Sequence, residues 1–458
     1  MLSTVAILGL FLLSLAVTVQ HGLKWALPYA VVPGLILLGP TNPLELKGLP
    51  DMTTMVAISY GCLLGLPFSG KAVRLIWHPV DTVLMLLVLV YGISNLTNLA
   101  LWDGISGWGN EFLQFVVPYF VARVGIVDLD VRKALLKVLT VILVGLLPFA
   151  LYEWRLSPNW LSRQLELLNI TTTANEMVLY RFGLARTLLT FQQPIDTGNS
   201  ALLIMGLMLV LLMTTGQRDW RHWKTWGPLA LAVFIGWTSM SFTFVAAFMS
   251  AAGTLLLLVK GKPWMVHLVW VSMYAMLFGL WQFMLSRPPP EDFGDMTVEA
   301  SWTMRVIIVQ NTYGPMFERG LFGTATLDTI KALSENSVDN AYILMVLLRG
   351  WIYMGLFLLL PAFFAESARR AAAVLSPSER LPIYACFAVL IGVMVGMFTV
   401  WFGFTFAKLW LIVLGSGVSL CQLALQHRAG ERGPAELPVG VAGPAAAQPV
   451  GGLVTARS

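Results

Sequence analysis

Residues 340–365 read NAYILMVLLRGWIYMGLFLLLPAFFA, a long apolar run whose one charged side chain is Arg349. A helix of about 20 consecutive apolar residues crosses the hydrocarbon core of a bilayer, so this stretch predicts a membrane-spanning helix. Similar runs recur along the whole chain, in which 57% of the 458 residues are hydrophobic and 12% are charged. Because a soluble domain carries roughly 25% charged residues, the composition excludes an ordinary water-soluble protein.

The apolar runs predict an all-α polytopic membrane protein with about 12–13 transmembrane helices in one domain, residues 1–426. The candidate spans are approximately 2–20, 24–39, 51–68, 80–98, 106–122, 134–152, 197–215, 227–242, 243–259, 264–284, 340–365, 382–400 and 404–424. No polar turn separates 227–242 from 243–259, so this pair is either two short helices or one broken helix. Residues 427–458 are rich in Gly, Pro and Ala and are expected to form a disordered cytoplasmic tail.

The basic residues of the short loops predict the orientation. If the spans alternate, one side collects Lys71, Arg74, Arg123, Arg132, Lys133, Arg218, Arg221, Lys224, Lys260, Lys262, Arg369, Arg370 and Arg380. An excess of Lys and Arg marks the cytoplasmic side. The two long polar segments, 153–196 and 285–339, are therefore expected together on the external face. Segments of that length between packed helices tend to be functional, so a site is expected there.

Candidate site residues lie where these external segments approach the spans. Arg181 and Arg186 precede the span that begins after Gln193-Pro194, and an arginine at a membrane boundary can either snorkel or bind an anion. The second segment holds Trp302 and Arg305 in an amphipathic helical stretch. It closes on Asp339-Asn340-Ala341-Tyr342, where Asp339 and Asn340 could equally be an N-cap pair of the following helix.

The charged residues inside predicted spans include Glu111, Arg349 and Lys408. A charge at that depth is costly unless it is paired or faces a polar cavity. Glu111 and Lys408 are expected to neutralise each other. The same residues keep open a different class of function, a membrane transporter or flippase. A non-catalytic assembly protein is the third alternative.

The sequence gives little support to a disulfide-stabilised, zinc-binding, phosphate-loop or nucleic-acid-binding protein. The three cysteines, Cys62, Cys386 and Cys421, lie inside apolar runs and are expected to be free and buried. No zinc-type or phosphate-loop spacing is present. The net charge of +5 needs no nucleic-acid partner, because basic loops orient a membrane protein.

Several short motifs resemble those of the O-antigen ligase and O-antigen polymerase superfamily of bacterial envelope proteins, both in their order and in the common side of the membrane on which they lie. The motifs are an arginine before Phe191-x-x-Pro194, Trp302-x-x-Arg305, Gly320-Leu321-Phe322-Gly323, and Asp339-Asn340 at the start of a span that carries Arg349-Gly350. The version Val338-Asp339-Asn340-Ala341-Tyr342 is similar to exopolysaccharide polymerases in particular. The resemblance covers about residues 80–425.

The resemblance implies a glycosyltransferase of GT-C-like architecture in the bacterial inner membrane, with no metal and no cofactor. A glycan on a polyprenyl pyrophosphate carrier would be moved, with inversion, to an acceptor hydroxyl at the external face. A polymerase uses another lipid-linked glycan as acceptor, and a ligase uses a lipid or protein. A chain-length regulator is a further expected partner of a polymerase, and no nucleic acid is involved.

Residue roles follow from the same resemblance. Arg186 and Arg305 would bind the pyrophosphate, and Asp339 stands where ligases have the histidine that activates the acceptor. Substrate binding is assigned to Arg181, Arg349, Asn340, Tyr342, Trp302 and Gln193. None of the five histidines lies in an external segment, which favours a polymerase and a carboxylate base, with Glu153, Glu318 and Glu335 as competitors of Asp339.

The chemistry of arginine and carboxylate side chains supports these roles independently of the resemblance. A guanidinium bonds phosphate oxygens in a bidentate fork and keeps its charge. Fixed cations that face the developing negative charge of a leaving group are often the largest catalytic term. A carboxylate at a partly desolvated membrane mouth can serve as the general base.

Overall fold

The computed structural model describes residues 2–39, 43–44, 50–73, 75–156, 159–168, 180–181, 184–191, 193–216, 223–287, 298–318, 320–324, 340–398 and 404–431. The side chains of residues 162, 224, 298–305, 404 and 427–431 are outside this description. Among the sequence predictions, Asp339, Glu335 and the tail beyond 431 therefore lie outside the described residues, as do the side chains of Trp302 and Arg305.

The described part of the chain is mostly helical, with one short hairpin and an isolated β-bridge between Leu44 and Met52. Nine of its helices are long and apolar enough to cross a membrane: α1 (Leu2–His21), α4 (Pro79–Asn98), α7 (Leu129–Arg155), α9 (Pro194–Thr214), α11 (Phe242–Lys260), α12 (Met265–Ser286), α15 (Ala341–Val374), α16 (Pro377–Met397) and α17 (Phe404–Glu431). By helix length and hydropathy the chain is a multi-pass membrane protein, which confirms the predicted class.

The remaining elements complete the described part of the bundle. They are η1 (Leu23–Trp25), η2 (Leu27–Val31), α2 (Val32–Leu37), α3 (Thr54–Gly65), α5 (Leu101–Glu111), η3 (Phe112–Val116), α6 (Val117–Gly125), α8 (Trp160–Leu167), β1 (Tyr180–Arg181), β2 (Leu184–Ala185), α10 (Trp223–Thr238) and α13 (Val298–Glu318). The predicted span 106–122 is thus a helix with a π-helical stretch, η3, in its middle. The predicted pair 227–259 is two helices, α10 and α11, joined by a tight turn at which Met240 has φ 48°.

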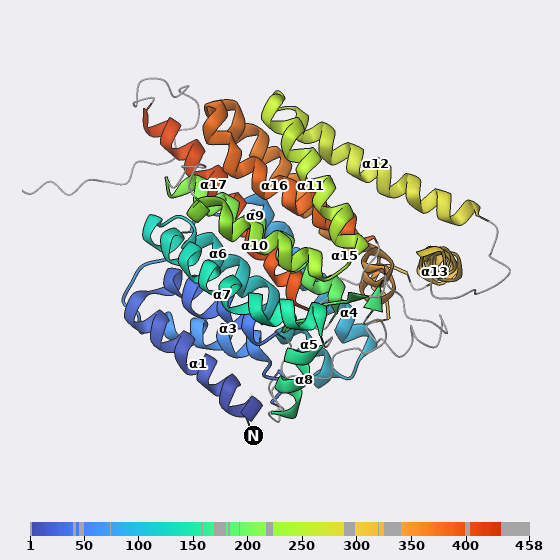
Figure 1. The fold of residues 1–458 in the computed structure, drawn as a ribbon, viewed down its shortest axis with the longest axis horizontal. Coiled ribbons are helices and arrows are strands. Elements are labelled where there is room, and N and C mark those ends of the chain that lie inside the picture. Colours follow the sequence, from blue (N-terminus) through green and yellow to red (C-terminus); the bar gives the residue numbers. More distant parts are fainter. Residues whose placement is uncertain are drawn as a thin grey trace, which may run out of the picture.

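Burial separates central helices from peripheral ones. The apolar spans of α9, α16 and α17 are 78%, 83% and 72% buried, whereas those of α1 and α12 are 17% and 22% buried. Figure 1 accordingly shows α1 and α12 at opposite margins of the bundle, with α9, α16 and α17 between them. The peripheral helices expose apolar faces, as contact with the hydrocarbon core of a bilayer requires. Their backbone polar groups are hydrogen-bonded within each helix, which a bilayer also requires.

Several predicted basic loops do meet at one end of the bundle. Lys24 pairs with Asp128 at 2.5 Å, and the Nζ atom of Lys71 donates to the backbone oxygen of Gln20 at the end of α1, at 2.8 Å. Arg132 donates to the last turn of α9 at 3.2 Å. These contacts bring the ends of α1 and α9 together with the start of α7, as alternating spans require. That this end is cytoplasmic stays a prediction.

Arg123 differs from the loop cations with which it was grouped. It lies within α6, its side chain is 1% exposed, and it forms an ion pair with Asp81 of α4, whose side chain is 0% exposed. Its other donors reach Ser419 Oγ at 3.0 Å and Gln422 Oε1 at 2.7 Å, both on α17. Because a buried charge must be paired and hydrogen-bonded, this cluster ties α4, α6 and α17 together.

Candidate functional site

Two predicted site arginines are held side by side on the β1–β2 hairpin. In this antiparallel pair Tyr180 faces Ala185, and Arg186 follows directly. The Nη1 atom of Arg181 donates to the carbonyl oxygen of Met240 at 3.0 Å, and the Nε atom of Arg186 donates to that of Ser239 at 3.1 Å. Both guanidiniums therefore dock on consecutive carbonyls of the turn between α10 and α11.

The backbone after the hairpin is fixed by a buried carboxylate. Glu153, near the end of α7, is 0% exposed; its Oε2 atom accepts the backbone N–H groups of Leu188 and Leu189, each at 2.9 Å. Its Oε1 atom accepts the N–H of Leu161 at the start of α8, at 2.9 Å. These bonds hold the chain in place where Leu189 has φ 55°. Glu153 thus anchors the segment that carries Arg186, a geometry that does not suit a base for an acceptor hydroxyl.

The arginine pair concentrates positive charge. Burial lowers the pKa of Arg181, and burial first and the neighbouring Arg181 charge second lower the pKa of Arg186 to about 10. Both guanidiniums remain protonated at neutral pH. Two like charges held together by the backbone create a positive potential that an anionic ligand would relieve.

The start of α15 lies close to the turn between α10 and α11. Asn199 of α9 and Thr243 of α11 both lie against Gly396 of α16, and the Nδ2 atom of Asn340 donates to the carbonyl oxygen of Phe398, just beyond α16, at 2.9 Å. The ends of α9, α11, α15 and α16 therefore meet at the same end of the bundle as the arginine pair.

Asn340 and Tyr342 have structural partners. Asn340 Oδ1 accepts the backbone N–H groups of Tyr342 at 3.0 Å and Ile343 at 3.2 Å, so the N-cap interpretation of Asn340 is confirmed. The hydroxyl of Tyr342 donates to the carbonyl oxygen of Met394 at 2.6 Å and is buried. Gln193 is the half-buried N-cap residue of α9, and its carbonyl accepts the N–H of Thr197 at 3.1 Å.

The predicted helical stretch around Trp302 and Arg305 is confirmed as part of α13. Figure 1 shows α13 end-on, below the right-hand end of α12, and the Nε2 atom of Gln310 donates to the carbonyl oxygens of Met284 at 3.1 Å and Arg287 at 2.6 Å. Trp351 Nε1 donates to the Met316 oxygen at 3.1 Å, which joins α13 to α15. This helix therefore lies at the end of the bundle where α12 ends. Glu318, its last residue, is exposed.

The direct ion-pair partner of Glu111 is Arg349 and not the predicted Lys408. Arg349 forms an ion pair with Glu111 and donates to the hydroxyl of Tyr353 at 2.7 Å. Its guanidinium carbon also lies 4.2 Å from the centre of the Tyr91 ring. A planar guanidinium can bond a carboxylate and stack on a ring at the same time, which an ammonium group cannot. Lys408 interacts with the charges of both Asp196 and Glu111.

Arg349 sits at a break in α15. Gly350 has φ 86° and ψ 174°, and the stretch Gly320–Thr324 packs into the gap. The N–H of Thr324 donates to the Leu347 carbonyl at 2.8 Å, and the N–H of Ile352 donates to that of Leu321 at 3.4 Å. The Gly-Leu-Phe-Gly and Arg-Gly motifs, separate in the sequence, therefore form one unit that fixes Arg349.

Replacing Gly350 by alanine is expected to destabilise this unit. A Cβ atom at Gly350 would lie 1.9 Å from the Leu321 carbonyl oxygen, and the positive φ is itself unfavourable for alanine. The expected loss is about 2–3 kcal/mol of unfolding free energy, measured by chemical denaturation of the purified protein in detergent. In the same helix, Gly355 has open space around it, so Gly355→Ala should be neutral or stabilising by about 0.5–1 kcal/mol. Equal effects of the two substitutions would contradict the role of the break.

Sequence reasoning found the arginines but missed most of the groups that hold them. Glu153 was weighed as a base, and Tyr91 and Ser94 were not singled out, although Ser94 Oγ donates to the Phe322 carbonyl of the inserted stretch. The one available signal was the spacing of Arg349 and Tyr353, which puts both on one face of a helix. Comparison with protein-family models and with curated proteins finds no match to this chain.

Proposed function

We propose that this chain is a bacterial inner-membrane polysaccharide polymerase. It transfers a glycan from a polyprenyl pyrophosphate carrier to an acceptor sugar hydroxyl at the external face, with inversion and without a metal ion. The observation that carries the proposal is the Arg181–Arg186 pair, held by backbone carbonyls at one end of a bundle of membrane helices. Twelve or thirteen spans of GT-C-like arrangement, with both long segments outside, belong to the same proposal.

The proposed reaction breaks the bond between the anomeric carbon and the pyrophosphate oxygen. The acceptor oxygen forms the new bond on the opposite face of the sugar, its proton passes to a carboxylate, and the pyrophosphate leaves on its carrier. Charge builds up on the leaving oxygen as the bond breaks. Guanidiniums fixed in advance stabilise that charge without reorganising, which supports Arg186 and Arg181 in this role.

The remaining roles in the proposal come from the second external segment. Arg305, on α13, would complete the cationic clamp, and Asp339 would accept the acceptor proton. Two observations support assigning these roles to the second external segment. First, α13 is joined to α15 through Trp351. Second, the start of α15 meets the end of α16 near the turn between α10 and α11 that bonds the two arginines. Asn340 and Tyr342 then act by holding that helix start in place.

A ligase-type transfer to a lipid or protein acceptor is the alternative within the same chemistry, because the donor and the clamp would be identical. A transporter is the alternative of a different class. The observation in its favour is the set of charges within the helices, since such charges often line translocation paths. Glu111, Asp196 and Lys408 are buried, and Arg349 is half-buried.

The test is reconstitution of the full-length protein in nanodiscs with lipid-linked repeat units and excess chelator. We expect glycans of several repeat lengths on the lipid carrier, and a chain-length regulator should change their distribution but not their linkage. Product that forms only when divalent metal is restored would contradict the proposed mechanism. Movement of lipid-linked glycan across sealed vesicles without polymer formation would replace the proposal with the transporter alternative.

A further inference from the structure

Basic side chains gather around one carboxylate at the end of α15 that lies opposite to the arginine pair. Glu366 accepts two hydrogen bonds from Arg369, Nε to Oε2 and Nη2 to Oε1, each at 2.8 Å. The Nε atom of Arg370 donates to the same Oε1, and the Nε2 atom of His267, in the first turn of α12, lies 2.9 Å from Oε2. The proposed transfer reaction uses none of these residues.

The charge of Glu366 balances only one of the two guanidiniums that it holds. Arg369 uses Nε and Nη2 in this contact and Arg370 uses Nε, and the described residues supply no acceptor to their remaining N–H groups. The two side chains are 36% and 65% exposed. A group that is already held in place loses less conformational freedom when it binds a ligand. The cluster therefore offers exposed and partly ordered donors to an anion.

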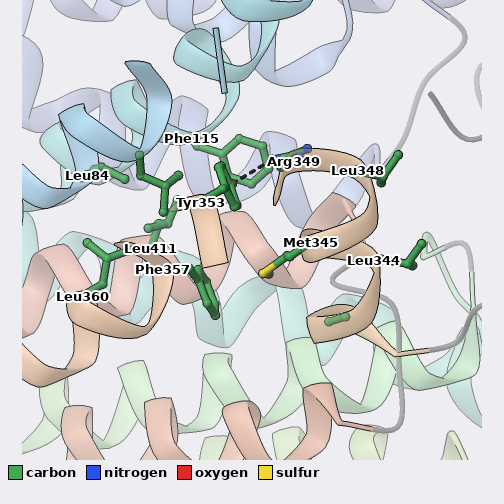
Figure 2. Close-up of a pocket in the computed structure, with 12 residues that line it drawn as sticks. Leu84, Phe115, Leu344, Met345, Leu348, Arg349, Tyr353, Phe357, Leu360 and Leu411 are labelled. Carbon is green, nitrogen blue, oxygen red and sulfur yellow. Dashed lines mark hydrogen bonds between the residues drawn. The ribbon is translucent and has the colours of Figure 1, made fainter. Parts of the chain in front are cut away.

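The ion pair of Arg349 shows the opposite arrangement. Its guanidinium pairs with Glu111 and donates to the Tyr353 hydroxyl, and Figure 2 shows it among apolar side chains of the helices. One cation there meets one carboxylate, which leaves no net charge. At Glu366 two guanidiniums share one carboxylate at the surface, so positive charge is left over for a ligand.

Two lysines add to this positive charge. Lys260 is the last residue of α11, and the carbonyl oxygen of Lys262 accepts the N–H of Met265 at the start of α12, at 2.9 Å. Both side chains are exposed, and within the described part of the chain neither forms an ion pair. Together with the arginines of Glu366 they make four cations against one anion, a surplus of three positive charges even when His267 is neutral. Clusters of Lys and Arg beside membrane helices attract anionic lipids.

An exposed apolar face of α12 adjoins the cluster. Trp264, Leu268 and Val271 are 55%, 47% and 52% exposed, and their spacing of four and three residues puts them on one helix face. Tryptophan is enriched where membrane meets water. The boundary between water and hydrocarbon therefore lies beside the cluster, and a ligand that carries both a phosphate and acyl chains fits the two surfaces at once.

We infer that this cluster binds the phosphate of an anionic phospholipid, whose acyl chains lie along the exposed face of α12. The remaining N–H groups of Arg369 and Arg370 bond the phosphate oxygens, as guanidiniums commonly do. A free anion would gain the same charge but not the contact with Trp264 and Leu268, which favours the lipid. The inference does not depend on the transfer reaction, because the cluster and the arginine pair lie at opposite ends of the bundle.

The test measures binding of phosphatidylglycerol to the delipidated full-length protein in detergent, by native mass spectrometry, with zwitterionic phosphatidylcholine as the comparison lipid. We expect the wild type to bind its first phosphatidylglycerol at least about tenfold more tightly than phosphatidylcholine. The Arg369→Gln/Arg370→Gln variant should lose most of that preference. No preference in the wild type, or an unchanged preference in the variant, would overturn the inference.

Lys133→Gln/Lys137→Gln is the matched control, because it removes two exposed positive charges from the start of α7 at the same end of the bundle. Its preference should stay within about twofold of that of the wild type. Equal losses in the two double variants would indicate general attraction to a basic protein and would overturn the site. If the double arginine variant fails to fold, Arg370→Gln alone, at the 65% exposed position, should reduce the preference by about threefold or more, and an unchanged preference there counts against the inference.

Two further measurements identify what is recognised. Arg369→Lys/Arg370→Lys keeps both charges but lacks the planar forks, so it should recover only part of the preference. Full recovery would overturn the assignment to guanidiniums. Inorganic phosphate in millimolar excess should not displace the bound lipid, because it lacks the acyl chains. Displacement would replace the lipid with a free anion and overturn the inference.

Discussion

Arg186→Ala is expected to lower the rate of polymer synthesis by about 10²–10³-fold, the usual cost of removing one fixed donor that stabilises a developing anion. Arg186 is 3% exposed and its Nε atom is bonded to the Ser239 carbonyl, and the neighbouring Arg181 is itself bonded to the Met240 carbonyl. Arg186→Lys should recover only part of the rate, because an ammonium keeps the charge but lacks the planar fork. The measurement is the initial rate of glycan extension in nanodiscs.

The matched control is Arg155→Ala. Arg155 is the last residue of α7, two positions after Glu153, and its exposed guanidinium stacks on Trp154 at 4.9 Å. Removing this surface charge should change the rate by no more than about twofold. A folded Arg186→Ala protein that keeps the wild-type rate and polymer length would remove Arg186 from the mechanism.

Asp81→Asn is expected to cause the largest loss of stability, about 3–5 kcal/mol, because it leaves the charge of Arg123 buried without its counter-ion. The two side chains are 0% and 1% exposed. The asparagine oxygen can still accept from Tyr119, but its NH₂ group can no longer accept the backbone N–H of His78, which now bonds the second carboxylate oxygen at 2.8 Å. Chemical denaturation of the purified protein in detergent measures the change.

A second ion pair at the same end of the bundle provides the control. Lys24 and Asp128 are 39% and 28% exposed, and the Lys24 hydrogen bond is the main cause that lowers the pKa of Asp128. Water screens such a pair, so Asp128→Asn should cost about 0–1 kcal/mol. If the two substitutions destabilised the protein equally, the buried Arg123 cluster would not be the tie between α4, α6 and α17.

The helices were predictable from sequence because hydropathy is a local property. Each apolar run overlaps a helix in the structure, and the N-cap of α15 at Asn340 was also readable, since a cap depends on residues that adjoin it in sequence. The turn between α10 and α11 carried no clear signal. It is formed by Ser239 and Met240, whose carbonyls are then used by the two arginines.

Long-range partners could not be predicted in the same way. Glu111 was expected to pair with Lys408 because both carry charge inside a span, yet Arg349 is its ion-pair partner. Arg349 reaches this position because α15 breaks at Gly350, and that break depends on a stretch inserted from elsewhere in the chain. Glu153 raised the same difficulty, since its backbone donors at 161, 188 and 189 become neighbours only after folding.

The most direct test of the central claim is the affinity of the full-length protein in nanodiscs for a polyprenyl diphosphate and for the matching monophosphate. If Arg181 and Arg186 hold the pyrophosphate, the wild type should bind the diphosphate at least about tenfold more tightly. The Arg181→Ala/Arg186→Ala double variant should lose that preference while it still binds both lipids weakly. An unchanged preference for the diphosphate in the double variant would contradict the account.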